Sequence, residues 1–185
     1  MNVWVNLVLY QATWVAAVAG AGRGLWWPGL IVLAAFALLQ LGLGPWRRAD
    51  ACLVVGASLL GFILDSTFVQ LGLMQFQAPV PWPGFAPVWM VALWTSFALT
   101  LNHSLAFLHG RPVLAAVLGA IGAPAAYWAA ASGWHALAFP LGLAPMLGAT
   151  AIAWALLMPL LSRASLRLRS LDATTAGYSL LQAKP

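Results

Sequence analysis

Charged residues are scarce in this chain, and glutamate is absent from it. Only 6% of the 185 residues are charged and 63% are hydrophobic, whereas a soluble domain carries roughly 25% charged residues. So few charges cannot cover a water-facing surface, which excludes an ordinary soluble domain. The mean hydropathy of +0.92 instead predicts a single all-α domain in lipid, a polytopic membrane helix bundle.

Cysteine is almost as rare, and the single Cys52 excludes a disulfide within the chain. The three histidines, His103, His109 and His135, lie in separate segments and do not have the spacing of metal ligands. P-loop, dinucleotide-binding and His-Glu-x-x-His motifs are absent, and Ser104 lacks the Gly-x-Ser-x-Gly setting of a hydrolase. We therefore expect no metal and no cofactor.

Long apolar runs are present, by contrast, and they predict about six transmembrane helices. Gly, Pro, Arg and Trp residues bound these runs, and a proline-rich stretch at 78–84 cannot be helical. Pro140 and Pro145 make the start of the last helix the least certain boundary. The predicted helices cover approximately residues 3–20, 26–43, 51–74, 87–108, 113–131 and 136–161.

The basic residues give these helices an orientation, because cytoplasmic loops of membrane proteins are rich in Lys and Arg. With the N-terminus in the cytoplasm, the predicted cytoplasmic segments carry seven basic residues and the outer loops carry only Arg23. We therefore predict that both termini are cytoplasmic, in a bacterial inner membrane. Residues 1–161 form the predicted bundle, and residues 162–185 form a short basic cytoplasmic tail. The net charge of +5 predicts contact with anionic membrane lipids and not with nucleic acid.

Asp65 is the one acid inside a predicted span, and ionisable groups at membrane depth are costly. It shares a helix face with Ala57 and Gly61, so this face is narrow enough for another helix to approach closely. One hypothesis makes Asp65 a proton-carrying or cation-binding carboxylate. The other makes it a structural acid that bonds to Thr and Ser side chains of a neighbouring helix.

A second group of polar residues falls at one depth in the cytoplasmic half of the bundle. We predict that they face one another around a polar cavity, because lipid offers them no hydrogen-bond partner. The alternative is that they only join helices through hydrogen bonds. Counting about 1.5 Å per residue separates Asp65 from His103 by roughly 14 Å, so no direct contact is expected. The candidate cavity residues are Asn6, Gln11, Gln40, Asn102 and His103.

Three stretches resemble an uncharacterised bacterial membrane family, domain of unknown function 2878. They are Asn6-x-x-x-x-Gln11-x-x-Trp14, Gly61-x-x-x-Asp65 and the segment from Pro87 to Ser104, whose Thr-Leu-Asn-His-Ser run is the most specific part. The resemblance covers nearly the whole chain up to Leu161. It implies an inner-membrane protein and leaves the function open.

A shorter likeness concerns the tryptophan-rich sensory protein family. The run Pro81-Trp82-Pro83-Gly84-Phe85-Ala86-Pro87-Val88-Trp89 is similar to its proline-rich approach to a tryptophan-rich helix. That family has five helices, whereas the charges here favour six.

Three functions fit these observations. The leading hypothesis is a non-enzymatic protein that binds or moves a small amphipathic or lipid-like molecule through the polar cavity. The second is a membrane-embedded enzyme acting on a lipid, with His103 as acid or base and Asn102 orienting it. The third is an accessory subunit that packs against a larger membrane partner. One buried acid and one buried histidine at different depths favour a protein that is not an enzyme.

Overall fold

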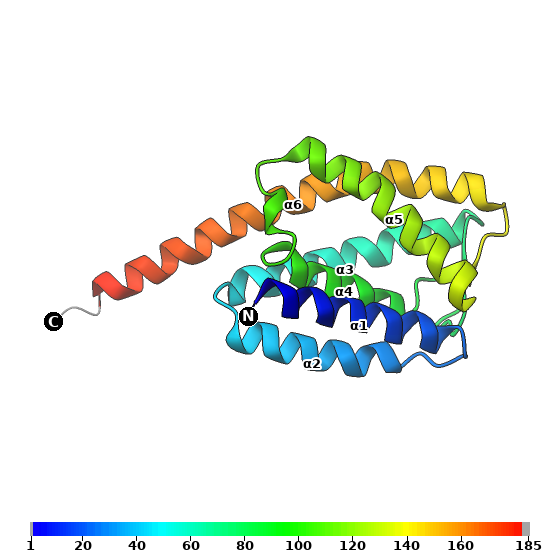
Figure 1. Ribbon diagram of the computed structural model, residues 1–185, viewed down its shortest axis with the longest axis horizontal. Helices are drawn as coiled ribbons and strands as arrows, with labels where there is room; N and C mark the ends of the chain where they lie inside the picture. The colour runs from blue at the N-terminus through cyan, green and yellow to red at the C-terminus, as the bar shows by residue number, and fades with distance from the viewer. Residues whose placement is uncertain (1, 183–185) are drawn as a thin grey trace.

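Six α-helices form an elongated bundle, and the last and longest of them projects from one end (Figure 1). The computed structural model describes the backbone of residues 2–182 and the side chains of residues 2–170. Two short strands and a 3-10 helix complete the described chain. The elements are α1 (Val3–Ala21), α2 (Pro28–Leu43), α3 (Arg47–Gln70), β1 (Gln75–Phe76), α4 (Val88–Leu101), η1 (Ala106–Leu108), α5 (Pro112–Trp134), β2 (Leu137–Ala138) and α6 (Leu143–Gln182).

Four of these helices are long and apolar enough to cross a membrane, namely α1, α3, α5 and the described part of α6. The helices α2 and α4 are also apolar but have only 16 and 14 residues. The prediction of an all-α bundle with six helices is therefore confirmed. That all six cross the membrane stays a prediction.

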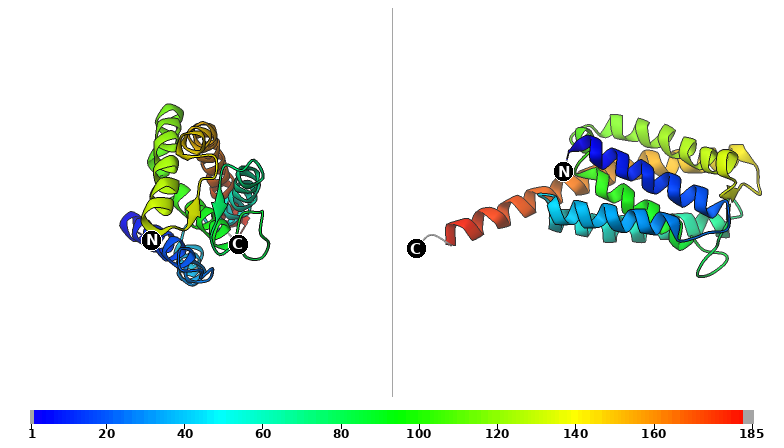
Figure 2. Two further views of the ribbon diagram at one scale, coloured as in Figure 1. Left: turned by 90° about the vertical axis from the view of Figure 1, so that its right-hand side faces the viewer. Right: turned by 60° about the horizontal axis from the view of Figure 1, so that its bottom comes forward.

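The helices run alternately along the long axis of the bundle, so each end collects one set of connections (Figures 1 and 2). The N-terminus, the α2–α3 turn and the α4–α5 connection lie at one end, from which α6 also projects. At the other end, β1 pairs antiparallel with β2. Prolines at the first helical position begin α2 and α5, where a missing backbone N–H costs nothing.

Several predicted helix boundaries were wrong. The third helix runs from Arg47 to Gln70 and not from residue 51 to residue 74. The last helix starts at Leu143 and not at residue 136, because Leu137 and Ala138 pair with β1. The fourth helix ends at Leu101 and not at residue 108. There the Ser104 N–H bonds to the side chain of Asn6, and such side-chain bonds compete with the helix ladder.

The tail predicted from residue 162 begins inside a continuous helix, since α6 runs from Leu143 to Gln182 without a break at Leu161. Ser162 and Ser165 are buried, so this helix still packs on the bundle after Leu161. The division between bundle and tail, and the cytoplasmic place of the tail, stay predictions.

Small residues allow the closest helix approaches. A Cβ atom on Gly61 of α3 would lie 2.1 Å from the Trp94 ring of α4, and one on Gly119 of α5 would lie 2.3 Å from a backbone oxygen of α6. Ala57, Gly61 and Asp65 are all buried. The predicted narrow face of this helix therefore does lie at a helix interface, as close packing in membranes requires.

Apolar side chains cover the outside of the bundle as well as its core. Leu38 is 75% exposed and Ile152 is 67% exposed, whereas Trp89 and Met146 are fully buried. A water-facing bundle would carry charged residues at such positions. This distribution fits a bundle surrounded by lipid.

Candidate functional site

Polar side chains from four helices and from the connection after α4 meet at the end of the bundle that holds the N-terminus. They form a connected set of hydrogen bonds, which we call the polar network. Asn6 comes from α1, Gln40 from α2, Asp50 from α3 and Ser165 from α6, and the remaining members follow α4. The network consists of Asn6, Gln40, Asp50, Asn102, His103, Ser104, His109 and Ser165.

Asp50 is the centre of the polar network and is fully buried. One carboxylate oxygen accepts a hydrogen bond from Asn102 Nδ2 at 2.8 Å, and the other lies 2.8 Å from His103 Nε2. It lies in the first turn of α3, a position where acidic residues are common because the N-terminus of a helix carries a partial positive charge.

Sequence reasoning missed Asp50 as a site residue, because it placed the third span from residue 51 and Asp50 in the loop before it. The helix in fact begins at Arg47. An acid in the run Arg-Arg-Ala-Asp, just before a long apolar stretch, is typical of the first turn of a helix. That signal places Asp50 in the first turn of the helix.

One part of the polar network joins α1 and α2 to the end of α4. Asn6 Nδ2 donates to Gln40 Oε1 at 3.1 Å and to the backbone oxygen of Leu99 at 2.9 Å, and Asn6 Oδ1 accepts from Ser104 Oγ at 2.6 Å. Gln40 Nε2 lies 2.5 Å from His103 Nε2. Four of the five predicted cavity residues, Asn6, Gln40, Asn102 and His103, are thus brought together.

Another part of the polar network connects α6 to the segment between α4 and α5. Ser165 Oγ donates to Asn102 Oδ1 at 2.7 Å and lies 2.9 Å from His109 Nε2. Because the single hydroxyl proton of Ser165 goes to Asn102, His109 must be the donor in the second contact. Burial lowers the pKa of His109, and the positive charge of Arg169 lowers it further, which favours a neutral imidazole.

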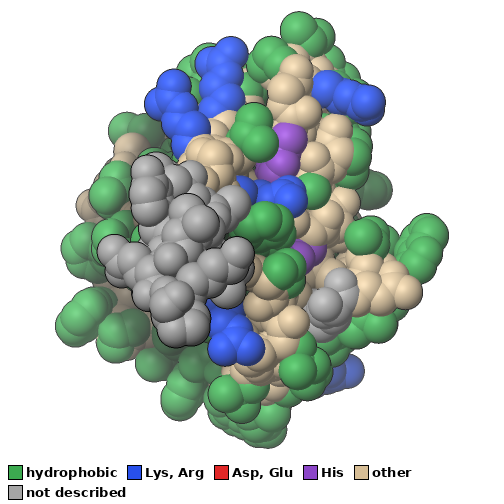
Figure 3. All heavy atoms as spheres, turned by 90° about the vertical axis from the view of Figure 1, so that its left-hand side faces the viewer, with side chains coloured by type: hydrophobic (Ala, Val, Ile, Leu, Met, Phe, Trp, Pro, Cys, Tyr) green, Lys and Arg blue, Asp and Glu red, His purple; other side chains and the backbone are tan. Residues whose placement is uncertain are grey.

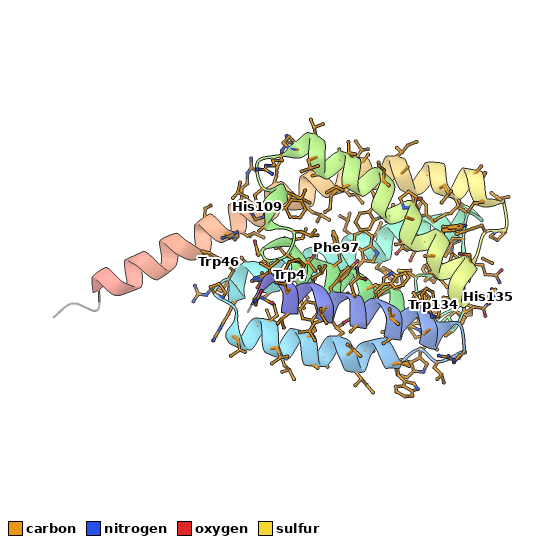
Figure 4. All side chains as sticks on the ribbon, viewed as in Figure 1. Trp4, Trp46, Phe97, His109, Trp134 and His135 are labelled. Carbon is orange, nitrogen blue, oxygen red and sulfur yellow. The ribbon has the colours of Figure 1, made fainter. Side chains whose placement is uncertain are left out.

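Arginines surround this end of the bundle. The Arg169 guanidinium lies 4.4 Å from the ring centroid of Trp46, and Arg47 donates to the backbone oxygen of Gly42 at the end of α2. Figure 3 shows basic side chains spread over this face with histidines between them, and Figure 4 labels Trp46 and His109 there. Among the described residues this face shows no acidic side chain, because Asp50 is buried.

Asp65 lies deeper in the bundle and has different partners from those predicted. Its carboxylate accepts from the Trp94 indole N–H at 2.8 Å and from the Tyr127 hydroxyl at 2.5 Å. The hypothesis that Asp65 bonds to Thr and Ser side chains was wrong. As predicted, Asp65 makes no hydrogen bond to His103 in the described part of the chain.

A cavity of about 340 Å³ lies beside Asp65, between α1, α4, α5 and α6. We call it the lateral cavity, because Gln11 of α1 and Leu118 and Gly122 of α5 line it and are themselves exposed on the side of the bundle. Aromatic rings form much of its wall. They belong to Tyr10, Trp14, Trp94, Phe97, Tyr127 and Trp154.

Gln11 is therefore separated from the other four predicted residues. It lines the lateral cavity, whereas Asn6, Gln40, Asn102 and His103 are not among the lining residues. Those four side chains use their polar atoms on one another. The polar network and the lateral cavity are thus two different features of the bundle.

Residues 3–160 match the family described as Protein of unknown function (DUF2878). The chain belongs to this family. The DUF2878 region contains Asp65, every residue that lines the lateral cavity, and the polar network from Asn6 to His109. It stops before Ser165 and Arg169, so the α6 residues that contact Asn102, His109 and Trp46 lie outside the matched region.

No curated protein and no solved structure matches the chain. Membership of the DUF2878 family confirms the resemblance seen in the sequence and supplies no activity. The likeness to the tryptophan-rich sensory protein family stays a prediction. The functional argument therefore depends on the chemistry of the lateral cavity and of the polar network.

Proposed function

We propose that this protein is a polytopic protein of the bacterial inner membrane that binds a small, neutral, lipid-like molecule in the lateral cavity. The observation that supports this proposal best is an apolar cavity that opens on the side of a membrane-type bundle. A molecule dissolved in the bilayer reaches such an opening without crossing water.

The size and lining of the lateral cavity suit a small ligand. Its volume of about 340 Å³ falls within the range of roughly 300–1,000 Å³ that is usual for ligand pockets. Gln11 lies midway along α1 and is exposed, although lipid provides no hydrogen-bond partner at that depth. A polar group on the ligand would satisfy it.

The charges of the site favour a neutral ligand. The described residues that line the lateral cavity include no Arg, Lys, His, Asp or Glu. The nearby carboxylate of Asp65 already accepts two hydrogen bonds. A charged ligand would therefore leave water without gaining an oppositely charged partner, which is costly.

A filled-cavity variant tests the proposal. A Cβ atom at Gly122 would meet nothing within 4 Å, and Gly122 lines the cavity, so Gly122→Phe places a ring in the empty space. Gly56→Phe is the matched control, because Gly56 on α3 is equally open and lies outside the cavity. Mild extraction followed by native mass spectrometry should show a bound small molecule in the wild type and in Gly56→Phe but not in Gly122→Phe. Equal retention by both variants would contradict the proposal.

The membrane orientation in this proposal has its own test. Reporter fusions after Leu43, Leu108 and Leu161 should read cytoplasmic, and fusions after Met74 and Ala131 should read outside. A reporter at the C-terminus that reads periplasmic would overturn the arrangement with six spans and both termini in the cytoplasm.

An enzyme that acts on a lipid is the second candidate, and the Asp50–His103 pair favours it. A carboxylate 2.8 Å from an imidazole is the usual arrangement of a general base. His103 is only 7% exposed in its side chain and does not line the lateral cavity, so a lipid substrate would have poor access to the imidazole. Binding in the lateral cavity therefore remains the function that the geometry supports best.

A further inference from the structure

We infer that the ligand of the lateral cavity carries a flat ring with a carbonyl or hydroxyl oxygen, and an apolar tail that extends into the lipid. This inference rests on the proposed function and names the chemical class of the molecule bound. It is based on the aromatic wall of the cavity and on the polar atoms in that wall that lack partners.

The aromatic wall offers faces and edges to a ring. Trp94 and Trp154 stack with centroids 4.7 Å apart, and Phe97 meets both edge-on, at 6.4 Å and 5.2 Å. Tyr10 in turn meets Phe97 edge-on. Figure 4 shows Phe97 in the middle of the bundle. Aromatic pairs of this geometry gain energy beyond area burial, so the wall favours a ring over a flexible chain.

One polar atom in this wall lacks a partner. Among the side chains of residues 2–170, the indole nitrogen of Trp154 is the single buried nitrogen or oxygen with no hydrogen bond. The neighbouring Tyr127 hydroxyl donates its own proton to Asp65, and no hydrogen bond joins it to the Trp154 N–H. A buried N–H without an acceptor is unfavourable, and an oxygen on a bound ring would supply that acceptor.

Two further polar groups line the lateral cavity without partners in the described chain. Tyr10 and Gln11 are adjacent on α1, and neither side chain makes a hydrogen bond. By contrast, the Trp94 N–H and the Tyr127 O–H are both committed to Asp65. The free donors therefore lie on two sides of the cavity, on α1 and on α6, which suits a ring with oxygens at opposite positions.

Asp65 acts as a positioning residue in this arrangement. It holds Trp94 and Tyr127 from two different helices, and Trp94 in turn stacks on Trp154. The carboxylate thus fixes the wall against which the ring would lie. The opening between α1 and α5 then leaves the tail facing the lipid.

Three probes of matched length test the inference with purified wild-type protein. The first is a naphthoquinone with one short isoprenoid tail, the second is naphthalene with the same tail, and the third is a straight-chain alcohol with the same number of carbons. Native mass spectrometry measures the complex of one probe with one protein, and Gly122→Phe shows whether a probe occupies the lateral cavity. The naphthoquinone should bind at least about tenfold more tightly than either of the other probes.

Trp154→Phe isolates the unpartnered N–H, because phenylalanine keeps an aromatic ring and removes the donor. It should weaken naphthoquinone binding about tenfold and leave naphthalene binding unchanged. Trp128→Phe is the matched control, since Trp128 is 52% exposed and lies outside the cavity. If Trp154→Phe does not fold, Tyr10→Phe tests a second free donor in the same way.

The outcomes separate the two proposals. Equal binding of all three probes, each abolished by Gly122→Phe, would overturn the ring and oxygen preference and leave the proposed function standing. Tighter binding of the alcohol would do the same. Binding of no probe at a site sensitive to Gly122→Phe would overturn the proposed function together with this inference.

Discussion

Asp50 and Asp65 lie on the same helix, about four turns apart, and both are fully buried. Asp50 is in contact with Asn102 and His103 inside a network that links α1, α2, α3 and α6. Asp65 holds only Trp94 and Tyr127, and a cavity lies beside it. Asp50 joins helices at the end of the bundle, whereas Asp65 holds two residues that line the lateral cavity.

The two regions also differ in their unused polar groups. In the polar network, the Asn6 amide uses both its oxygen and its nitrogen, and the Ser165 hydroxyl both donates and accepts. In the lateral cavity, Tyr10, Gln11 and the Trp154 N–H have no partner in the described chain. This contrast supports a structural role for the polar network and, under the proposed function, a ligand in the lateral cavity.

Removing the centre of the polar network should have the largest effect. Asp50→Ala leaves Asn102 and His103 without their buried acceptor, and breaking one partner of a buried pair costs about 3–5 kcal/mol. We expect a large fall in melting temperature in detergent. Asp50→Asn keeps one acceptor oxygen and should lose less. Equal melting temperatures for Asp50→Ala and the wild type would show that the network does not hold the helices together.

A bulky side chain at the interface of α3 and α4 should have the next largest effect. Gly61→Leu drives atoms into Trp94, whose ring would already lie 2.1 Å from a Cβ atom, and such overpacking costs about 1–3 kcal/mol. Thermal unfolding in detergent measures the loss. Gly56→Leu is the control, because that position on the same helix is open. If both variants melt alike, the narrow face of α3 does not pack as described.

A pair of variants separates the two regions directly. His103→Ala removes one member of the polar network and should lower stability by about 1–3 kcal/mol, while naphthoquinone binding stays at its wild-type value. Gln11→Leu should do the reverse, with weaker binding and an unchanged melting temperature, because Gln11 is exposed and bonds to no side chain in the described chain. Weaker binding in His103→Ala would instead support a site that includes the polar network, as the sequence alone predicted.

The pH dependence of stability should show the smallest effect. The pKa of His109 is lowered by burial and by Arg169. As the pH falls through the usual histidine pKa, the unfolded chain therefore binds a proton that the folded chain does not, and stability is lost. Above that pKa the contribution of His109 to stability is fully present.

His109→Gln keeps an N–H donor for Ser165 and does not titrate, so its melting temperature should fall less than that of the wild type on acidification. Solvent reaches part of His109, which keeps the difference small. Parallel curves for the two proteins would count against a neutral His109.

Composition and charge predicted the fold class well, because lipid requires apolar helices whatever their detailed packing. The close approach of α3 to α4 was also predictable, since Ala57, Gly61 and Asp65 recur at helical spacing. The end of α4 was not predictable. It depends on Asn6, which lies 98 residues from Ser104 and takes the Ser104 backbone N–H out of the helix ladder.

The candidate site was predicted only in part. Equal depth predicted one group of five residues, of which Asn6, Gln40, Asn102 and His103 share hydrogen bonds in the structure. Depth does not tell which side of a helix a residue faces. Gln11 is five positions from Asn6, which is about 500° of helical rotation and turns it away by about 140°. The partners of Asp65 were missed because a Trp and a Tyr in an apolar run read as core residues, although each also carries a hydrogen-bond donor.

Pro159 gives α6 a particular mechanical property. It lies between Trp154, which lines the lateral cavity, and Ser165, which belongs to the polar network. Because proline has no N–H, the carbonyl of Ala155 loses its normal helix bond, and bending is easiest at that point. The two segments of α6 therefore have a compliant joint between them. Under the proposed function, this joint would let the cavity wall adjust to a ligand while the contacts of Ser165 and Arg169 hold the far segment in place.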